Sequence, residues 1–313
     1  MTTKSQRQAY GEALVELGKE NKNVVVLEAD LGKSTMSILF QNAYPERYFE
    51  MGIAEANMAS TAAGLSLTGK VPFINSFAVF STGRCFDQLR QTISIAGLNV
   101  NICGSSAGLS DFGDGSTHQS VEDMAIMRAI PNMTVLVPVD AIETRKMVRA
   151  MAKHAGPCYI RINRNELPFY TSEEGEYVIG KLYPVREGRD VIVFANGVMV
   201  SKAMEAAESL EKEGLSVKVV NVSTVKPLDK AAVVAMAKGF KAVVTAEEHS
   251  VVGGLGSAIA EALAGVKDVP IGFVGIEDRF GTSAANYDEL LVYYGLTADA
   301  VKDRIKKTIK QGE

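Results

Sequence analysis

The polar, glycine-rich loop GDGSTHQSVED, residues 113–123, holds two side chains that could take part in chemistry. His118 is one of only three histidines in 313 residues, and Asp114 precedes it in the same loop. Histidine is the side chain that gains or loses a proton near neutral pH. Apolar segments over 98–104 and 133–138, which are predicted to be buried strands, lie on either side of the loop. A scarce histidine placed there beside an aspartate is a candidate functional residue.

A glutamate and two phenylalanines mark further candidate positions. Glu55 lies in the first turn of a predicted helix over 54–68, among alanine, asparagine and methionine. Negative charge is favoured at a helix N-terminus, so Glu55 is either a helix-dipole residue or a partly buried carboxylate that hydrogen-bonds a ligand nitrogen. Phe77 and Phe80 lie where the strand predicted over 71–77 gives way to a helix. They either pack in the core or stack on a flat ring, because ligands gather at strand ends in α/β folds.

These side chains need a framework of strands and helices that brings them to one edge of a sheet. Continuous apolar runs predict buried parallel strands, at 23–30, 71–77, 98–104, 133–138, 158–163, 191–197, 215–222, 241–248 and 269–276. Helical patterns lie between them, at 4–20, 54–68, 84–96, 121–130, 140–153, 200–213, 228–238, 255–265 and 297–311. Asp140 is the expected N-cap of its helix.

The alternation of strands and helices predicts an α/β fold, and its one interruption predicts two doubly wound domains. The segment over 165–190 contains two prolines, three glycines and many charges. Such a composition is typical of a linker between domains. We expect a first domain at 1–170, a linker at 171–189 and a smaller second domain at 190–313.

Composition and charge exclude several classes of function. Apolar residues make up 47% and charged residues 22%, as in an ordinary soluble globular protein. The net charge is −4 and no basic face stands out, so we expect no nucleic-acid partner. The N-terminal residues lack an apolar segment of signal-peptide type, and no apolar run is long enough to span a membrane. Three cysteines show no metal-ligand spacing, so we expect a cytoplasmic protein with no metal ligands of its own.

Taken together, the sequence motifs resemble the C-terminal half of transketolase. The matching segments occur in the family order and cover nearly the whole chain. They are RQAYGEAL (7–14), EADLGKST (28–35), MGIAEANM (51–58), PFINSFAVF (72–80), GDGSTHQSVED (113–123), RINRNE (161–166) and EEHSVVGGLGSAIAE (247–261). The resemblance implies the pyrimidine-binding domain of the thiamine-diphosphate enzymes, followed by the small C-terminal domain of transketolase.

The motif that binds the diphosphate and its metal in this family is not among the matching segments. GDG at 113–115 has the letters with which that motif begins, but the motif also needs an asparagine pair beyond a following βα unit. Asn132 is too near, and it lies in a turn that leads into a strand. The resemblance therefore implies a split transketolase, in which a separate N-terminal subunit holds the diphosphate and a divalent metal such as Mg²⁺. We expect the two kinds of subunit to share the site, in a dimer or an α2β2 assembly.

For the cofactor, thiamine diphosphate, the resemblance implies contacts from four residues of this chain. Glu55 faces N1′ of the aminopyrimidine ring and handles its proton, which makes it a catalytic residue. Phe80 stacks on that ring with Phe77 beside it, and Asp30 lies near the cofactor. One departure from the family concerns Gly83, which has no side chain at a position where many relatives carry a tyrosine or an arginine.

For the substrates, the resemblance implies a second catalytic residue and a binding site for a sugar phosphate. His118 contacts the oxygens at C1 and at the carbonyl, and stabilises charge while the carbon–carbon bond is made and broken. Asp114 reads a sugar hydroxyl. Arg7, Ser34 and Arg164 hold the phosphate, for which arginine is suited because its fork can bind two oxygens.

The expected reaction is the transfer of a two-carbon ketol unit from a ketose phosphate to an aldose phosphate. Three alternatives are the β subunit of a 2-oxo acid dehydrogenase, one half of a 1-deoxyxylulose-5-phosphate synthase, and a non-catalytic partner that only completes a dimer. The first family lacks DGSTHQ with its aspartate, and the second enzyme is normally one long chain. The presence of Glu55, Phe80 and His118 together argues against the third.

Overall fold

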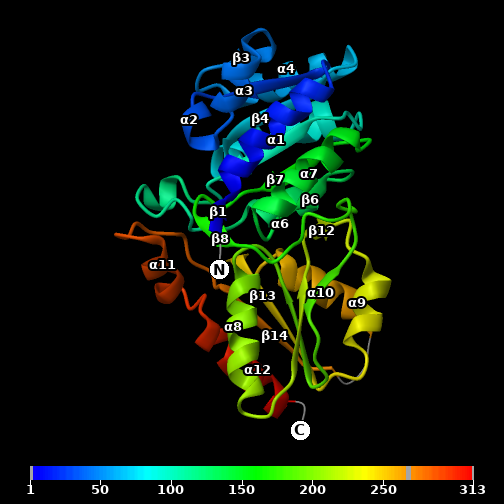
Figure 1. Cartoon of the computed structure of the whole chain (residues 1–313), viewed down its shortest axis with the longest axis vertical. Helices are drawn as coiled ribbons and strands as arrows, with labels where there is room; N and C mark the ends of the chain where they lie inside the picture. Colours follow the sequence, from blue (N-terminus) through cyan, green and yellow to red (C-terminus); the bar gives the residue numbers. More distant parts are fainter. Residues whose placement is uncertain (1–2, 266–268, 312–313) are drawn as a thin grey trace.

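The computed structural model describes residues 3–265 and 269–311, and it contains two α/β layers that follow one another along its long axis (Figure 1). The first layer is a seven-stranded sheet in the order β12-β6-β7-β5-β4-β2-β3. Its strands are β2 Val24–Glu28, β3 Tyr48–Glu50, β4 Val71–Phe77, β5 Asn101–Ser105, β6 Thr134–Leu136, β7 Cys158–Arg161 and β12 Thr224–Lys226. Every residue of β2 and β5 is buried, as expected for parallel strands covered on both faces.

The second layer is a five-stranded sheet in the order β14-β13-β10-β11-β9. Its strands are β9 Tyr183–Arg186, β10 Val191–Ala195, β11 Val217–Asn221, β13 Ala242–Ser250 and β14 Ile271–Ile276. All neighbours are parallel except β9, which lies within the predicted linker at 171–189 and runs antiparallel to β11. A separate pair joins β1 Thr3–Ser5 to β8 Glu166–Pro168. The predicted fold class, α/β with two domains, is confirmed.

Helices cover both sheets (Figure 1). Those of the first layer are α1 Gln6–Glu20, α2 Gly32–Thr35, α3 Ile38–Ala43, α4 Glu55–Leu67, α5 Phe86–Gln88, α6 Asp123–Ala129 and α7 Ala141–Lys153. Those of the second are α8 Met199–Glu211, α9 Lys230–Ala237, α10 Leu255–Leu263, α11 Tyr287–Tyr293 and α12 Ala298–Gln311. Asp140 caps α7 as predicted, because its side chain accepts a hydrogen bond of 2.8 Å from the amide of Glu143. Within the described ranges, no helix has the length and apolar character needed to cross a membrane.

The helix predicted over 84–96 differs in type from the expectation. Helical structure begins earlier, with a π-helical turn at Phe80–Arg84, and a second π-helical turn at Leu89–Ser94 follows α5. The amide of Ile95 accordingly donates to the carbonyl of Arg90, five residues back, at 3.1 Å. A π turn holds more residues than an α turn, so it changes the direction in which side chains project.

Strand β12 belongs by sequence to the second predicted domain but pairs with the first sheet. Thr224 and Lys226 lie antiparallel to Leu136 and Val135 of β6, at the place where the two layers meet (Figure 1). A strand of three residues is too short for a sequence pattern to predict. The C-terminal part of the chain therefore contributes one strand to the first sheet, so the two layers are joined by this strand as well as by the linker.

The second layer also holds the loop that carries His118. Glu248, on β13, accepts a hydrogen bond of 2.8 Å from the amide of Leu109. The side-chain amide of Gln119 donates to the carbonyl of Thr282 at 3.0 Å. Glu248 and Gln119 are buried, whereas Thr282 is exposed, so the first of these hydrogen bonds is the better shielded from water.

Candidate active site

The carboxyl ends of β2, β4 and β5 meet at one edge of the first sheet, because these strands are parallel neighbours. Phe77 is the last residue of β4, and Asp30 and Ser34 follow β2 closely. Asp114 and His118 belong to the segment that follows β5. Ligands collect at this edge in α/β folds.

Five side chains form what we call the aromatic cluster: Glu55, Phe77, Phe80, His118 and Arg84. The ring centroids of Phe80 and His118 lie 5.3 Å apart with an interplanar angle of 75°. Those of Phe77 and Phe80 lie 6.1 Å apart with an angle of 13°. Arg84 joins the rings to the carboxylate, because its Nη1 lies 2.7 Å from Glu55 Oε1 and its Cζ 4.0 Å from the centroid of Phe80.

Glu55 is the first residue of α4 and is only 4% exposed. The amides of a first helical turn have no partners within the helix, so they favour a carboxylate at this position. A buried carboxylate also needs a charged or hydrogen-bonding partner, which Arg84 provides. Glu55 is therefore both helix-terminal and buried, and its hydrogen bond to a ligand nitrogen stays a prediction.

Arg84 was missed by the sequence analysis. A single arginine in a helical segment gives no spacing signal. The one signal for a cation in this segment was Gly83, where the resemblance to the family implies a tyrosine or an arginine in many relatives. In this chain the arginine is Arg84, one residue after Gly83, at the end of the π-helical turn at Phe80–Arg84.

The His118 ring is steeply inclined to both phenylalanine rings of the aromatic cluster. Its centroid lies 6.2 Å from that of Phe77, at 69°. Its Nδ1 lies 3.0 Å from the hydroxyl oxygen of Thr117. With Nδ1 engaged there, Nε2 is the nitrogen that can serve a ligand.

A second group, which we call the arginine cluster, consists of Arg7, Ser34, Arg164 and Asp111. Arg7 donates from Nε to the carbonyl of Arg164 at 3.2 Å and from Nη1 to the carbonyl of Ser34 at 2.5 Å. Burial and the neighbouring charge of Arg164 lower the pKa of Arg7. Two guanidinium groups held this close together would be stabilised by an anionic ligand.

Asp111 is the member of the arginine cluster that the sequence analysis did not predict. It is 2% exposed, and its Oδ1 lies 2.8 Å from Nη1 of Arg164. Burial raises the pKa of Asp111, Arg164 opposes this rise, and the negative charge of Asp114 adds to it. Its Oδ2 is buried without a hydrogen-bond partner among the described residues. An aspartate in an irregular loop has no periodicity that would mark it in a sequence.

Asp114 and Asp30 are the two predicted site residues that lie outside both clusters. Asp114 is exposed, directly before a short 3-10 turn at Gly115–Thr117, where its charge acts on Asp111. Asp30 is also exposed, with a left-handed φ of 60°, and its amide donates to Glu50 at 2.8 Å. Asp30 thus lies at the same edge of the sheet, without a contact that ties it to the aromatic cluster.

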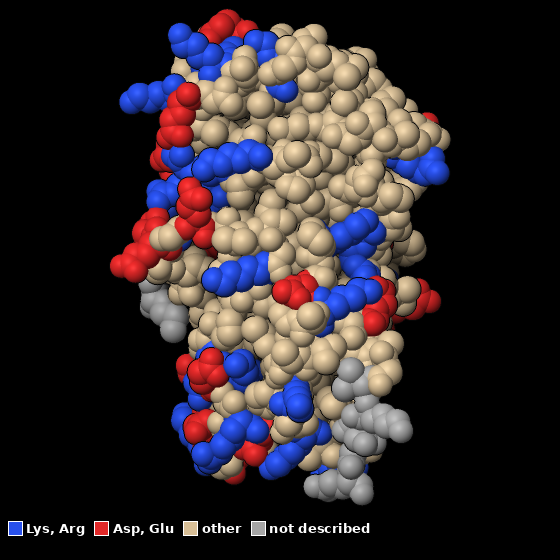
Figure 2. Space-filling model, turned by 90° about the vertical axis from the view of Figure 1, so that its right-hand side faces the viewer, with Lys and Arg blue, Asp and Glu red and all other residues tan. Residues whose placement is uncertain are grey.

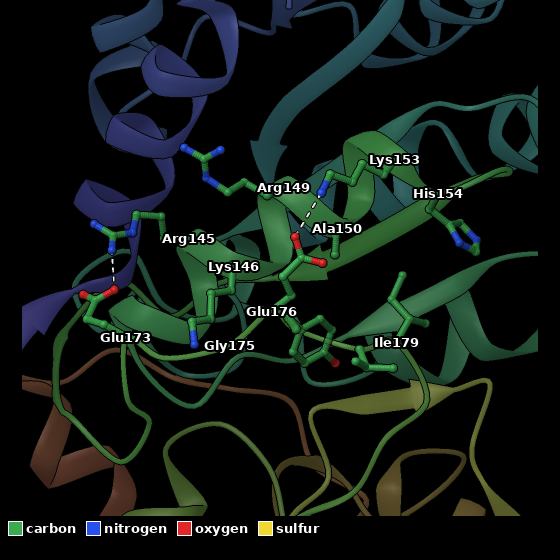
Figure 3. Close-up of a pocket in the computed structure, with 12 residues that line it drawn as sticks. Arg145, Lys146, Arg149, Ala150, Lys153, His154, Glu173, Gly175, Glu176 and Ile179 are labelled. Carbon is green, nitrogen blue, oxygen red and sulfur yellow. Dashed lines mark hydrogen bonds and ion pairs between the residues drawn. The ribbon is translucent and has the colours of Figure 1, made fainter. Parts of the chain in front are cut away.

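A cavity of about 480 Å³ lies elsewhere, between α7 and residues 173–179 (Figure 3). Neither cluster contributes a residue to it. Three of its four cations have carboxylate partners: Arg145 pairs with Glu173, Arg149 lies 2.7 Å from Glu20 and Lys153 lies 3.3 Å from Glu176. The fourth, Lys146, donates to the backbone carbonyls of Ser172 and Glu174. Across 3–265 and 269–311, no group of three or more His, Cys, Asp or Glu residues could hold a metal ion.

Two family models match the chain. The transketolase pyrimidine binding domain matches residues 2–169, and the transketolase C-terminal domain matches residues 180–301. The chain belongs to the transketolase family. The predicted resemblance to the C-terminal half of transketolase is thus confirmed.

Individual relatives agree with this assignment. The 6-deoxy-6-sulfo-D-fructose transketolase subunit of Clostridium sp. strain MSTE9 is 43% identical over 295 residues, which cover 94% of this chain and 91% of the relative. Transketolase of Mus musculus is 36% identical over 312 residues, which cover 98% of this chain but 49% of the mouse protein. A solved split-gene transketolase, described as an inactive β4 tetramer, is 46% identical with a TM-score of 0.90, and 99% of each chain is covered.

Proposed function

We propose that this chain is the C-terminal subunit of a split, thiamine-diphosphate-dependent transketolase. In this proposal it transfers a two-carbon ketol unit from a ketose phosphate to an aldose phosphate. The observation that carries the proposal is the aromatic cluster, in which Arg84 links a buried carboxylate to neighbouring phenylalanine and imidazole rings at the ligand-binding edge of the sheet.

The aromatic cluster fits the head group of thiamine diphosphate. The buried Glu55 carboxylate and the partly exposed Phe80 ring share Arg84 as a neighbour, which suits a flat ring with nitrogen atoms that takes the place of the guanidinium. When bound, thiamine diphosphate supplies the electron sink for breaking and forming a carbon–carbon bond. This chain would contribute Glu55 to hold a proton at the ring nitrogen and Phe80 to stack on the ring.

The remaining residues of the site would act on the sugar. His118, through Nε2, would donate a hydrogen bond to the substrate oxygen on which charge develops. Arg7 and Arg164 would bind the terminal phosphate, and Asp114 would read a sugar hydroxyl. His118 of the aromatic cluster and Asp111 of the arginine cluster are close enough for the charge of one to act on the other.

The proposal includes a partner, an N-terminal transketolase subunit that holds the diphosphate and a divalent metal such as Mg²⁺. Two of the relatives are themselves described as a transketolase subunit and as a split-gene transketolase. The surface offers room for such a partner, because Figure 2 shows a broad face with few charged side chains over the first domain. Ile53, two residues before α4, and Leu67, at its end, are 71% and 74% exposed. Single exposed apolar side chains are common on protein surfaces, so the broad face with few charges is the feature that favours a partner.

The test is reconstitution with that partner. The purified pair, supplied with thiamine diphosphate and Mg²⁺, should form sedoheptulose 7-phosphate from xylulose 5-phosphate and ribose 5-phosphate. The chain without a partner should form none. A pair that assembles and binds the cofactor but does not transfer a ketol unit between sugars would reject the proposed reaction.

A second candidate is the same reaction with a sulfonated ketose as donor. The observation that favours it is the relative named for 6-deoxy-6-sulfo-D-fructose, which is 43% identical to this chain. The arginine cluster could bind a sulfonate as well as a phosphate, since both are anionic groups with several oxygens. Comparing kcat/KM for 6-deoxy-6-sulfo-D-fructose and for xylulose 5-phosphate in the reconstituted pair distinguishes the two donors.

A further inference from the structure

Arg84 makes the two contacts that a cofactor ring would have to make in this site. Its guanidinium lies 2.7 Å from the Glu55 carboxylate and 4.0 Å from the centre of the Phe80 ring. Guanidinium is flat, carries N–H donors and stacks on aromatic faces. An aminopyrimidine ring shares the first two properties and, under the proposed function, would hydrogen-bond Glu55 while it stacks on Phe80.

Phe77 lies nearly parallel to Phe80, with the ring centroids 6.1 Å apart. A flat ring inserted between them would need about 7 Å, two contacts of about 3.5 Å each, so no ring fits between the two phenylalanines. Arg84 lies over the Phe80 ring and also contacts Glu55. A ring that stacks on Phe80 at this place and reaches Glu55 would therefore occupy the position that Arg84 now holds.

We propose that Arg84 holds the place of the cofactor's aminopyrimidine ring while the cofactor is absent, and is displaced when the ring binds. The proposal rests on the proposed function, because it takes thiamine diphosphate as the ligand. It gives Arg84 a role that none of the predicted site residues has. Arg84 keeps the buried Glu55 carboxylate paired in the free protein and competes with the ring for that carboxylate.

The surroundings of Arg84 allow it to leave. Its side chain is 48% exposed, whereas that of Glu55 is 4% exposed. The residue before it, Gly83, has no atom within 4 Å of the point where a side chain would begin. Breaking a half-exposed ion pair and a half-exposed cation–π contact costs little, since water solvates the released guanidinium. Glu55 would exchange the guanidinium for the ring nitrogen, sharing with it a proton taken up from solvent, and would not be left unpaired.

The test is the dissociation constant of thiamine diphosphate, measured by calorimetry on the assembled pair of subunits with Mg²⁺ present. Arg84→Ala removes the competitor and should tighten binding by about tenfold, the combined effect of one ion pair and one cation–π contact. Arg84→Lys keeps a charge near Glu55 but loses the flat stacked group. Its dissociation constant for thiamine diphosphate should therefore lie between those of wild type and Arg84→Ala. Arg90→Ala, which removes an exposed arginine from the following turn, is the matched control and should leave the affinity unchanged.

The outcomes separate the inference from the function on which it rests. If Arg84→Ala binds the cofactor more weakly than wild type, or equally well, Arg84 is a structural or ligand-binding residue and the displacement is wrong. If the wild-type pair binds no thiamine diphosphate, the proposed function fails instead. If Arg84→Ala fails to fold, two other measurements test the displacement. One is the affinity of Arg84→Lys for the cofactor, and the other is the shift of the Arg84 side-chain NMR signal when cofactor is added to the wild-type pair. A signal that does not move would overturn the proposal.

Discussion

Glu55 and His118 belong to different kinds of structure, and Glu55 is connected to Phe80 through Arg84 whereas His118 lies beside that ring. Glu55 is fixed by the first turn of α4 and is buried, whereas His118 is half-buried in a loop that the second layer anchors. A buried carboxylate at a helix start suits proton exchange with a ring that stays in place. A half-exposed imidazole suits contact with a sugar that enters and leaves.

Replacing Glu55 by alanine should lower kcat/KM of the reconstituted pair by much more than tenfold. A tenfold loss corresponds to about 1.4 kcal/mol of barrier, and removing a group that handles a catalytic proton is expected to exceed it. The measurement is steady-state ketol transfer, with circular dichroism to confirm that the fold is intact. Glu46→Gln, at an exposed glutamate on the short turn before β3, should behave as wild type. Turnover within tenfold of wild type in Glu55→Ala would remove Glu55 from the proton relay.

Replacing His118 by alanine should lower kcat well beyond tenfold, because its hydrogen bond strengthens as charge develops on the substrate oxygen. Measuring kcat and KM separately identifies the role, since a residue that only binds the substrate would change KM alone. His154→Ala is the control, because His154 lies outside both clusters and contacts Thr134. A normal kcat in His118→Ala contradicts the catalytic assignment.

At the scale of single residues, the sequence predicted those that carry a family motif and missed those that act through pairing. Phe80 and His118 lie in conspicuous segments, and the structure brings them into contact. Arg84 and Asp111 are recognisable only from what they touch, Glu55 in the first case and Arg164 in the second. An ion pair between residues that are far apart in the sequence produces no periodic pattern by which either residue could be predicted.

At the scale of elements, the buried parallel strands were predictable and the short or irregular pieces were not. β2 and β4 stand out because covered strands are continuously apolar. β12 was missed because its three residues have no pattern of their own, and its place is set by the neighbouring β6. The π-helical turn at Phe80–Arg84 was missed because π and α turns share the same apolar spacing over so few residues.

The loop that carries His118 depends on Gln119, which is buried and donates to the carbonyls of Asp111 and Thr282, each at 3.0 Å. Gln119→Ala leaves both acceptors without this donor and should lower the free energy of unfolding by about 1–3 kcal/mol. Urea denaturation measures the change. Ser105→Ala is the control, because the buried Ser105 hydroxyl finds no partner among the described residues and its loss should be nearly neutral. Equal stability of both variants would show that this loop is held by other contacts.

At the scale of the whole molecule, stability should fall as the pH rises toward neutrality. Burial raises the pKa of Glu28, Glu143 and Glu247 from 4.5 to about 7 in each case. Between these two values the folded chain keeps protons that the unfolded chain has released, so the free energy of unfolding decreases with increasing pH. His249, whose pKa burial lowers from 6.5 to about 4, has the opposite effect, which fades as the pH rises above 6.5. Above that pH the three carboxyl groups dominate the dependence.

Urea denaturation at several pH values between about 6.5 and 8 measures the slope of the free energy of unfolding against pH. Glu28→Gln should flatten it, because glutamine mimics the protonated form and can still serve the Thr35 and Ser37 hydroxyls that now donate to Glu28. Glu46→Gln, at an exposed position, should leave the slope as it is. A slope that is already flat in wild type would contradict the raised pKa of these three groups.

The pairing of β12 with β6 has a consequence for how this molecule can be divided. A truncated form that ends at the linker would lack β12, so β6 would become an edge strand. Its backbone N–H and C=O groups along Thr134–Leu136 would then be unpaired on the side where β12 lies. Bare strand edges recruit further copies into misassembled aggregates. The first layer is therefore complete only when translation has passed Lys226, which ties its maturation to the synthesis of a segment far along the chain.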